Sequence, residues 1–410
     1  MKKLLVGLAL VLGPALAQTQ LKVGVILPLS GPSAVAGKAA LNGIQLAADE
    51  ANAGGKVRME LVVVDDGTDP SKAVPAFTKL MTVDRVDIVI GGLASGVTFA
   101  LSGPVKQYGP LFLAIGAASS VVEQAFEGYP LFFHYHPWDY HNVAAALQFF
   151  QYLNREHGAK KVAILYEDGP FGSAGIKVYQ EQLKKLGYKV QAEPYKTGSG
   201  QFTPILTRFR AFQPDILYWI GYDVDALPIA AQTRQVGLRP KLIYGAPPSW
   251  PIGFEKNPLS QDVAGMTAWL PTLSNLESRR FVEAYRKKYG EVTEEYMAPM
   301  GYVIAKSLAL AAERAGSADK NRIAEALAEH PDNDELRAAV VLEASPRKVV
   351  AVLQTGETIT VSGDGLSFDG SALSDAVNPS TNFFNGTRGW LGTAVSNAGD
   401  LPRMTGGQGS

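Results

Sequence analysis

Residues 88–120 read IVIGGLASGVTFALSGPVKQYGPLFLAIGAASS, and this stretch decides the fold. The apolar run 88–90 ends in a small-residue turn that carries Ser95, and a helix-like segment follows to Tyr108. A second apolar run, 111–115, ends in another Gly/Ala/Ser turn. This order predicts a strand, a helix and a second, parallel strand. Because the carboxyl ends of neighbouring parallel strands lie side by side, we expect the two turns to meet.

Both turns contain groups that can bind a small anion. Backbone N–H groups at a helix N-terminus, together with serine hydroxyls, can hold a carboxylate. Ligands of open parallel sheets bind in the crevice beyond the carboxyl ends of the strands. The alternative is that the small residues only allow each turn to close tightly, which is the usual role of a single such turn. Two matched turns on adjacent strands favour a binding site.

The rest of the chain extends this unit into two similar lobes. Apolar strands alternate with helices over 21–133 and again over 161–244, including helices predicted at 171–185 and 223–236. Continuous apolar strands indicate parallel sheets that are covered on both faces. The helices predicted at 274–289, 295–315 and 321–329 are expected to complete the first lobe. We therefore predict an α/β fold with two doubly wound parallel-sheet lobes, joined by several crossovers, and a ligand cleft between them.

The expected domain boundaries follow from this pattern. They are a signal peptide at 1–17, a first lobe at 18–135 completed by 272–332, a second lobe at 136–271, and an atypical Gly/Asn/Ser-rich tail at 371–410. Part of 333–370 is a candidate to complete the second lobe. A hairpin that turns at Thr355-Gly356 is predicted there. The end of the chain is open to four interpretations: a distorted closing strand, an appended β-rich module, a fusion or a reading-frame error.

Composition limits the compartment and the partners. The chain has 410 residues, 46% of them hydrophobic, and a formal net charge of −1, which argues against nucleic acid or an anionic membrane as the main partner. Two lysines, an apolar run and Ala15-Leu16-Ala17 predict a cleaved secretory signal. Cysteine is absent, so no disulfide and no lipid anchor through cysteine is expected. We expect a periplasmic or extracellular monomer without a cofactor, and His134 and His136 lack a third metal ligand nearby.

Several stretches match one known family in unbroken order. They are LKVGVILPLSGPSAVAGKAALNGIQLAADEANA, LVVVDDGTDPSKAV, VDIVIGGLASG, PLFLAIGAASS, VAILYEDGPFGSAG, PDILYWIGYDVDA and the helix containing MGYVIAKSLALA, which together cover roughly residues 20–330. The chain resembles the periplasmic binding proteins of the branched-chain amino-acid type, which serve ABC importers. This resemblance implies the type I periplasmic binding fold, hinge closure on a small solute, delivery to a permease in the cytoplasmic membrane, and no catalysis.

The resemblance also implies ligand-binding residues. In the family, the turn aligned with 93–95 offers a hydroxyl and backbone donors to the ligand carboxylate, and the turn aligned with 117–119 offers a carbonyl and another hydroxyl. These positions are Ser95, Ala117 and Ser119 here. In the second lobe, Phe171 matches an aromatic residue over the ligand, and Tyr222 matches a pocket-lining Gly-Tyr pair. Core packing is the alternative role of these two aromatic residues.

One departure from the family concerns the ligand's ammonium group. Amino-acid-binding members have a glutamate after the strand aligned with 242–244, whereas this chain has Pro247 and Pro248. Since a buried ammonium without a partner is strongly unfavourable, an organic acid or amide without an α-ammonium is predicted ahead of leucine, isoleucine or valine. Asp223 is an alternative anchor that would restore amino-acid binding. Trp138 is a further candidate to line the cleft, or else packs against the hinge.

Three classes of function agree with the sequence to different degrees. A solute receptor for an ABC importer explains the export signal, the fold, both serine turns and the lack of catalytic groups. A ligand-sensing module of the same fold is the alternative, although the sequence has no kinase, DNA-binding or membrane segment to receive a signal. An exported enzyme is disfavoured because residues 92–96 lack the G-x-S-x-G spacing and there is no Walker loop or zincin motif.

Overall fold

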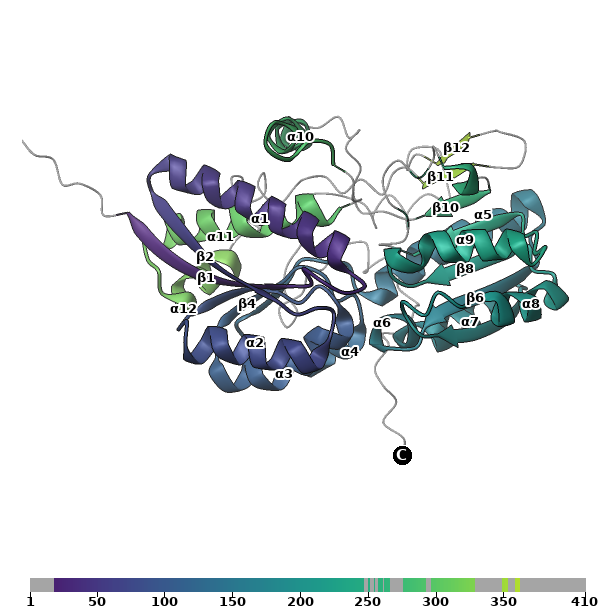
Figure 1. Ribbon diagram of the computed structural model, residues 1–410, viewed down its shortest axis with the longest axis horizontal. Coiled ribbons are helices and arrows are strands. Elements are labelled where there is room, and N and C mark those ends of the chain that lie inside the picture. The colour runs from purple at the N-terminus through teal and green to yellow at the C-terminus, as the bar shows by residue number, and fades with distance from the viewer. Residues whose placement is uncertain are drawn as a thin grey trace, which may run out of the picture.

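The computed structural model describes residues 18–246, 250, 254, 257–260, 262–265, 276–292, 296–328, 349–352 and 358–361. The predicted signal peptide at 1–17 lies outside these residues. The described chain forms two α/β lobes that lie next to each other, each built around one sheet (Figure 1). This arrangement confirms the two-lobe fold predicted from the sequence.

The first lobe contains a five-stranded sheet in the order β2-β1-β3-β4-β5. All neighbouring strands are parallel, and β3 pairs with β4 as the opening stretch predicts. The strands are β1 (Thr19–Leu27), β2 (Val57–Asp65), β3 (Ile88–Gly91), β4 (Leu111–Ala114) and β5 (Phe132–His134). The helices between them are α1 (Ala34–Gly54), α2 (Pro70–Thr82), α3 (Ser95–Tyr108) and α4 (Ser120–Ala125).

Helices from late in the chain pack onto the first lobe. They are α10 (Leu276–Tyr289), α11 (Met297–Ala315) and α12 (Lys320–Ala328), and their apolar residues share one core cluster with β1 and α1. Glycine lets α1 and α11 approach closely, because a Cβ built on Gly43 would lie 1.9 Å from the Ala298 carbonyl oxygen. On the α11 side of the same helix pair, a Cβ built on Gly301 would lie 2.2 Å from the Ala40 carbonyl oxygen. Only a residue without a side chain fits at these two positions.

The second lobe has a seven-stranded sheet in the order β12-β11-β10-β9-β8-β6-β7. Its strands are β6 (Lys161–Glu167), β7 (Lys189–Tyr195), β8 (Ile216–Ile220), β9 (Leu242–Gly245), β10 (Val263–Gly265), β11 (Val349–Val352) and β12 (Thr358–Val361). Strands β6 to β10 are parallel, whereas β11 and β12 form an antiparallel pair, which confirms the predicted C-terminal hairpin. The predicted turn residues of the hairpin lie outside the described part. Strand β11 extends the sheet by pairing antiparallel with β10.

Two helices predicted as continuous are divided in the structure. The segment 171–185 forms α6 (Pro170–Ala174) and α7 (Ile176–Lys185), separated at Gly175, where a Cβ would lie 3.2 Å from the Tyr179 ring. The segment 223–236 forms a 3-10 turn, η1 (Asp223–Asp225), before α9 (Ala226–Gln235). These two predictions were wrong because helix periodicity over a segment carries no signal for a break at a single residue or for a first turn of 3-10 form. The other helices of this lobe are α5 (Asp139–His157), α8 (Thr203–Phe212) and the short 3-10 segment η3 (Pro258–Ser260).

The start of α2 agrees with its sequence signal. Asp69 is the N-cap residue, and its carboxylate accepts a hydrogen bond of 2.8 Å from the Ser71 N–H. Pro70 takes the first helical position, where a missing N–H costs nothing. Pro75 lies within the helix.

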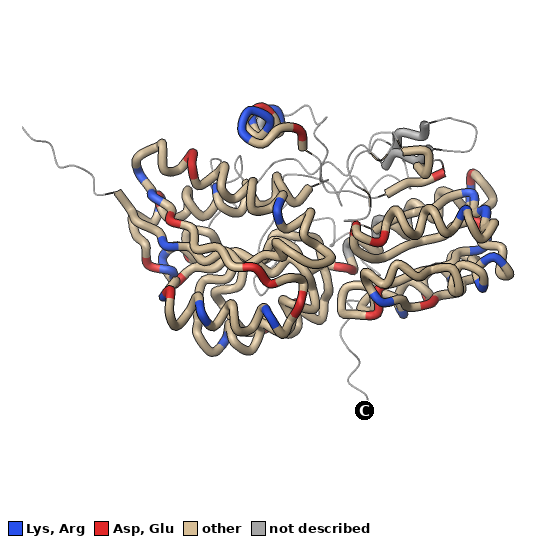
Figure 2. Tube along the Cα trace, viewed as in Figure 1, with Lys and Arg blue, Asp and Glu red and all other residues tan. Residues whose placement is uncertain are grey.

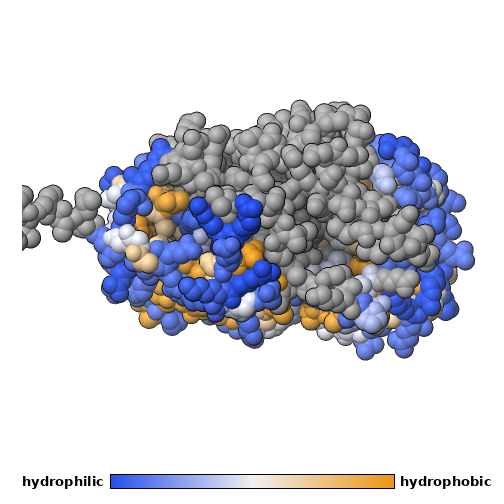
Figure 3. All heavy atoms as spheres, turned by 90° about the horizontal axis from the view of Figure 1, so that it is seen from above, coloured by the Kyte–Doolittle hydropathy of each residue, from blue (hydrophilic) through white to orange (hydrophobic). Residues whose placement is uncertain are grey.

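The surface of the described chain is largely hydrophilic at the outer ends of both lobes (Figure 3), and its apolar cores are buried. Hydrophilic residues cover most of the visible outer ends of both lobes (Figure 3). Figure 2 shows acidic residues at the junction of the lobes as well as on their outer surfaces. Among the described residues, no helix combines the length and the apolar character that crossing a membrane requires.

Candidate functional site

The two serine turns of the first lobe meet at the carboxyl ends of β3 and β4. Ser95 is the first residue of α3, and Ser119 is the N-cap residue of α4. The Ser119 N–H donates a hydrogen bond of 3.3 Å to Ser95 Oγ, and both residues are almost completely buried. Ser119 Oγ in turn accepts a 3.3 Å bond from the Val121 N–H. Since each hydroxyl acts here as an acceptor, its O–H can donate to a ligand.

The turn after β4 has a strained backbone. Ala117 has φ of 62°, in the left-handed region that residues with a Cβ rarely adopt. Its N–H donates a 2.7 Å hydrogen bond to the Leu93 carbonyl oxygen, which binds this turn to the turn after β3. Strain of this kind costs about 1–3 kcal/mol and is concentrated at ligand-binding sites. Ala117 therefore lies in the geometry expected of a preorganised turn.

Two aromatic residues of the second lobe lie over this region. Tyr222 follows β8 directly and Phe171 lies in α6, with their ring centroids 5.2 Å apart. The Tyr222 hydroxyl lies near the Ser95 backbone at the junction of the two lobes. A second contact is made by α6, since a Cβ built on Gly96 would lie 3.6 Å from Pro170 Cδ. The N-terminus of α3, where the helix dipole is positive, therefore faces the second lobe.

Buried carboxyl groups from both lobes act on the Tyr222 hydroxyl through their charge. Burial raises the pKa of Tyr222, and the negative charges of Glu167 and Asp66 raise it further. Glu167 ends β6 and accepts a 2.8 Å bond from the Gly172 N–H, and its own pKa is raised by burial. Asp66 follows β2, is 0% exposed, and has a pKa raised to about 6 by burial. Sequence reasoning missed both residues, although each stands at the carboxyl end of a predicted strand.

Asp139 connects the crossover between the lobes to the serine turn after β4. Its Oδ2 accepts hydrogen bonds from the Ser120 N–H at 2.9 Å and from Ser120 Oγ at 3.0 Å. Its own N–H donates a 2.5 Å bond to the Ala118 carbonyl oxygen. Burial raises the pKa of Asp139 to about 6. Sequence reasoning missed this residue too, although an acidic residue in the first turn of a predicted helix is a recognisable signal.

The crossover aromatic residues pack against each other. Trp138 is 1% exposed and stacks on His134 with ring centroids 3.6 Å apart, which agrees with the packing alternative. Burial lowers the pKa of His136 to about 4, so its imidazole is neutral at pH 7. Its Nδ1–H donates to the Pro137 carbonyl oxygen, so Nε2 accepts a 2.8 Å bond from the Tyr296 hydroxyl. In the described part of the chain, no group of three or more His, Cys, Asp or Glu residues could hold a metal ion.

The remaining candidate residues lie in the second lobe. Asp223 begins η1, and its buried Oδ1 has no hydrogen-bond partner. Burial raises the pKa of this carboxyl group to about 6. Pro247 and Pro248 lie outside the described residues, after β9 ends at Gly245.

Comparison with known proteins gives a consistent result. A family model described as periplasmic binding protein matches residues 20–351. The chain is 26% identical over 351 residues to Leu/Ile/Val-binding protein homolog 7 of Brucella melitensis, covering 80% of this chain and 86% of that protein.

Solved structures with low sequence identity share the fold. One is the branched-chain amino acid transporter substrate binding protein of Streptococcus pneumoniae in complex with isoleucine, with a TM-score of 0.68 and 22% identity, covering 83% of this chain and 98% of that one. Another is an ABC transporter solute binding protein of R. palustris in complex with benzoate, with a TM-score of 0.67 and 19% identity, covering 84% of this chain and 96% of that one.

Proposed function

Because the chain belongs to the periplasmic binding protein family, we propose that it is an extracytoplasmic receptor for a small carboxylate-bearing or amide solute. It captures the solute between its lobes and delivers it to the permease of an ABC importer in the cytoplasmic membrane. The signal peptide predicted at 1–17 exports the chain, and the receptor acts as a monomer without a cofactor.

The pair of serine turns is the observation that carries this proposal. Ser95 and Ser119 are joined by a hydrogen bond of 3.3 Å at the N-terminal ends of α3 and α4. A carboxylate placed there accepts hydrogen bonds from both hydroxyls and is stabilised by the positive end of the α3 dipole. Such bonds to a charged group contribute about 1.5–3 kcal/mol each.

The second lobe supplies the surface for the rest of the solute. Phe171 and Tyr222 form an adjacent pair of buried rings, which suits an apolar or planar body. The relatives crystallised with isoleucine and with benzoate bind ligands that combine a carboxylate with an apolar body. This shared chemistry supports the same division of the site here, with the carboxylate on the first lobe and the apolar part against the second.

A thermal-shift screen of the purified mature protein tests the proposal. The panel contains amino acids, aliphatic and aromatic carboxylic acids, and amides, with sugars and simple amines as negative controls. A ligand that binds only the folded state at 100 times its Kd stabilises the protein by about 2.7 kcal/mol, so the Tm rises for the true class. Titration calorimetry then gives the Kd of each compound that raises the Tm. Stabilisation by sugars or amines alone would contradict the proposed carboxylate or amide class.

A further inference from the structure

Two adjacent aspartates after β2 have different surroundings. Asp65 is exposed, and both of its carboxylate oxygens accept hydrogen bonds. The donors are the N–H groups of Leu29, Ser30 and Gly67 and the Ser30 hydroxyl. These bonds hold the turn after β1 against the turn after β2. Asp66 is 0% exposed, and its Oδ2 has no hydrogen-bond partner. The Oδ2 atom of Asp66 therefore does not help to hold the turn.

A second buried group without a partner lies beside Asp66. Ser33 is the N-cap residue of α1 and is 1% exposed, yet its Oγ makes no hydrogen bond. Thr68 connects the two residues, because its N–H donates to Asp66 Oδ1 at 2.8 Å and its Oγ1 accepts from the Ser33 N–H at 3.1 Å. Thr68 has φ of 59°, an unusual conformation for a β-branched residue. The local structure thus holds Asp66 and Ser33 in place while leaving one oxygen of each unused.

This pair lies at the junction of the lobes, close to the proposed carboxylate site. Strands β2, β1 and β3 are parallel neighbours, so the carboxyl end of β2, which Asp66 follows, lies at the same edge of the sheet as the turn that carries Ser95. The turn after β1 approaches the second lobe, since a Cβ built on Gly198 would lie 3.9 Å from Pro32 Cγ. Asp66 and the serine turns therefore lie at one edge of the first sheet, facing the second lobe.

An unpaired buried carboxylate is costly to retain unless a partner arrives. Removing a charge from water without hydrogen bonds is strongly unfavourable, and an N–H donor with positive charge is the partner that compensates best. Asp66 Oδ2 can only accept while ionised, and Ser33 Oγ can accept as well as donate. Both groups therefore suit a ligand that donates several N–H bonds.

We propose that Asp66, with Ser33 beside it, is a second recognition subsite that binds the ammonium or primary amide of the solute whose carboxylate is held at Ser95 and Ser119. This inference rests on the proposed function and narrows it to solutes that carry both a carboxylate and an N–H donor. It reverses the preference for acids without an ammonium, which was drawn from Pro247 and Pro248 alone. Asp66 of the first lobe takes the place of the glutamate that amino-acid-binding members have after the strand aligned with 242–244.

Titration calorimetry with matched pairs of compounds tests this subsite. The pairs are leucine with 4-methylpentanoate, phenylalanine with 3-phenylpropanoate, and succinamate with levulinate, which differ mainly in the nitrogen group. For at least one pair, the nitrogen-bearing member should bind the wild-type protein at least tenfold more tightly, and Asp66→Asn should remove that preference. Asp223→Asn tests the alternative anchor on the other lobe, a partly buried carboxyl group whose Oδ1 also has no hydrogen-bond partner, and should keep the preference if Asp66 binds the nitrogen group.

The stability of the variant shows whether loss of binding reflects unfolding. Asparagine keeps the Oδ1 that accepts the Thr68 N–H and removes the buried charge, so the Tm of Asp66→Asn at pH 8 should equal or exceed that of the wild type. If this variant does not fold, Ser33→Ala repeats the measurement and should weaken the same preference.

Four results would overturn the subsite. They are equal or tighter binding of the nitrogen-free member in every pair, an unchanged preference in Asp66→Asn, loss of the preference in Asp223→Asn alone, and no binding of any pair. Tight binding of nitrogen-free acids that is weakened by Ser95→Ala would overturn this inference and leave the proposed function standing. Failure of every carboxylate and amide, here and in the thermal-shift screen, would contradict both.

Discussion

The hydroxyls of Ser95 and Ser119 each have a structural role as well as the proposed binding role. Ser95 Oγ accepts the buried N–H of Ser119, and Ser119 Oγ caps α4 through the Val121 N–H. The Ser95 hydroxyl therefore places the turn after β4, the Ser119 hydroxyl caps α4 within that turn, and each O–H points to a ligand partner in the proposed complex. A change at either residue must affect stability and binding together, and the two effects have to be measured separately.

Replacing either serine should weaken solute binding. Ser95→Ala and Ser119→Ala each remove a hydrogen bond to a charged group, so the Kd of a carboxylate solute should rise about 10-fold to 100-fold in titration calorimetry. The empty variants should also lose about 1 kcal/mol of unfolding free energy, because a buried N–H or a helix cap loses its acceptor.

Ser120→Ala is the matched control for this experiment. Ser120 lies in the same turn, is buried, and directs its hydroxyl to Asp139 Oδ2 at 3.0 Å. Its variant should lose stability and keep its affinity. Unchanged affinity in both the Ser95 and Ser119 variants would mean that the serine turns are structural only.

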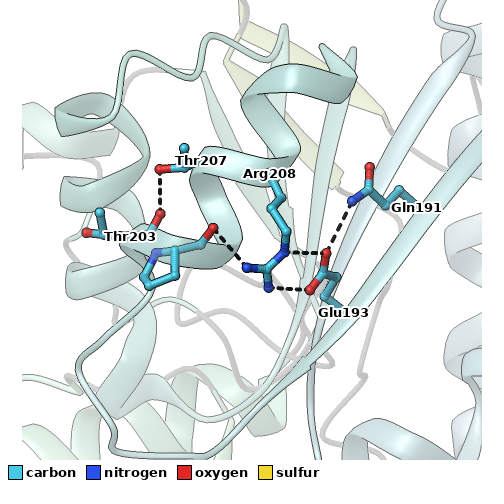
Figure 4. A network of polar contacts seen from close by, with 6 residues as sticks. Gln191, Glu193, Thr203, Thr207 and Arg208 are labelled. Atoms are coloured by element: carbon cyan, nitrogen blue, oxygen red, sulfur yellow. Dashed lines mark hydrogen bonds and ion pairs between the residues drawn. The ribbon is translucent and has the colours of Figure 1, made fainter.

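At the scale of elements, one polar network secures the edge of the second sheet. Strand β7 is an edge strand, and its Glu193 accepts two hydrogen bonds from the Arg208 guanidinium of α8, from Nε at 2.9 Å and from Nη2 at 2.5 Å (Figure 4). Gln191 donates to the same carboxylate at 3.2 Å. The bidentate geometry orients α8 on the strand more firmly than a single-point ion pair would. Since the Arg208 side chain is half exposed, solvent screens the pair and its contribution is modest.

This network makes a pH-dependent contribution to stability. The hydrogen bonds from Arg208 are the main reason that the pKa of Glu193 is lowered below its usual value of 4.5. A lowered pKa in the folded state means that the contribution is complete above about pH 4.5 and is lost as the pH falls through the folded-state pKa. Glu193→Gln should therefore have a slightly lower Tm than the wild type at pH 7 and an equal Tm near pH 3. Thermal scans in high salt should reduce the difference at pH 7, and a difference independent of pH and salt would exclude an ionic origin.

At the scale of the whole molecule, the two lobes are joined by contacts that solute entry must separate. The Ser95 backbone lies near the Tyr222 hydroxyl across the junction, Gly96 lies near Pro170, and Pro32 lies near Gly198. Ser95 and Tyr222 also belong to the proposed solute site. Entry therefore requires a hinge movement between the lobes, and the bound solute adds contacts to both of them.

Small-angle scattering should detect this movement. With a tightly bound solute, the radius of gyration should fall relative to the empty protein, because the solute bridges the serine turns and the aromatic pair. Ser95→Ala at the same solute concentration should compact less and should recover when the concentration is raised. An unchanged profile with a solute of measured high affinity would contradict the closure mechanism.

Local sequence features determined the architecture and much of the candidate site. Apolar runs ending in small-residue turns predicted the parallel strands β3 and β4, and the neighbour rule for parallel sheets placed Ser95 and Ser119 at one edge. The two-lobe repeat and the C-terminal hairpin followed from the same alternation of patterns. These features depend on periodicity and turn chemistry within short segments, which a sequence displays directly.

Only the tertiary structure decided how buried groups are paired. Thr68 occupies one oxygen of Asp66 and leaves the other unused, and the place of Asp66 relative to the site depends on the strand order β2-β1-β3. A sequence shows that a residue can accept a hydrogen bond or form a helix, but the burial and the partners that set its free energy come from segments far apart in the chain.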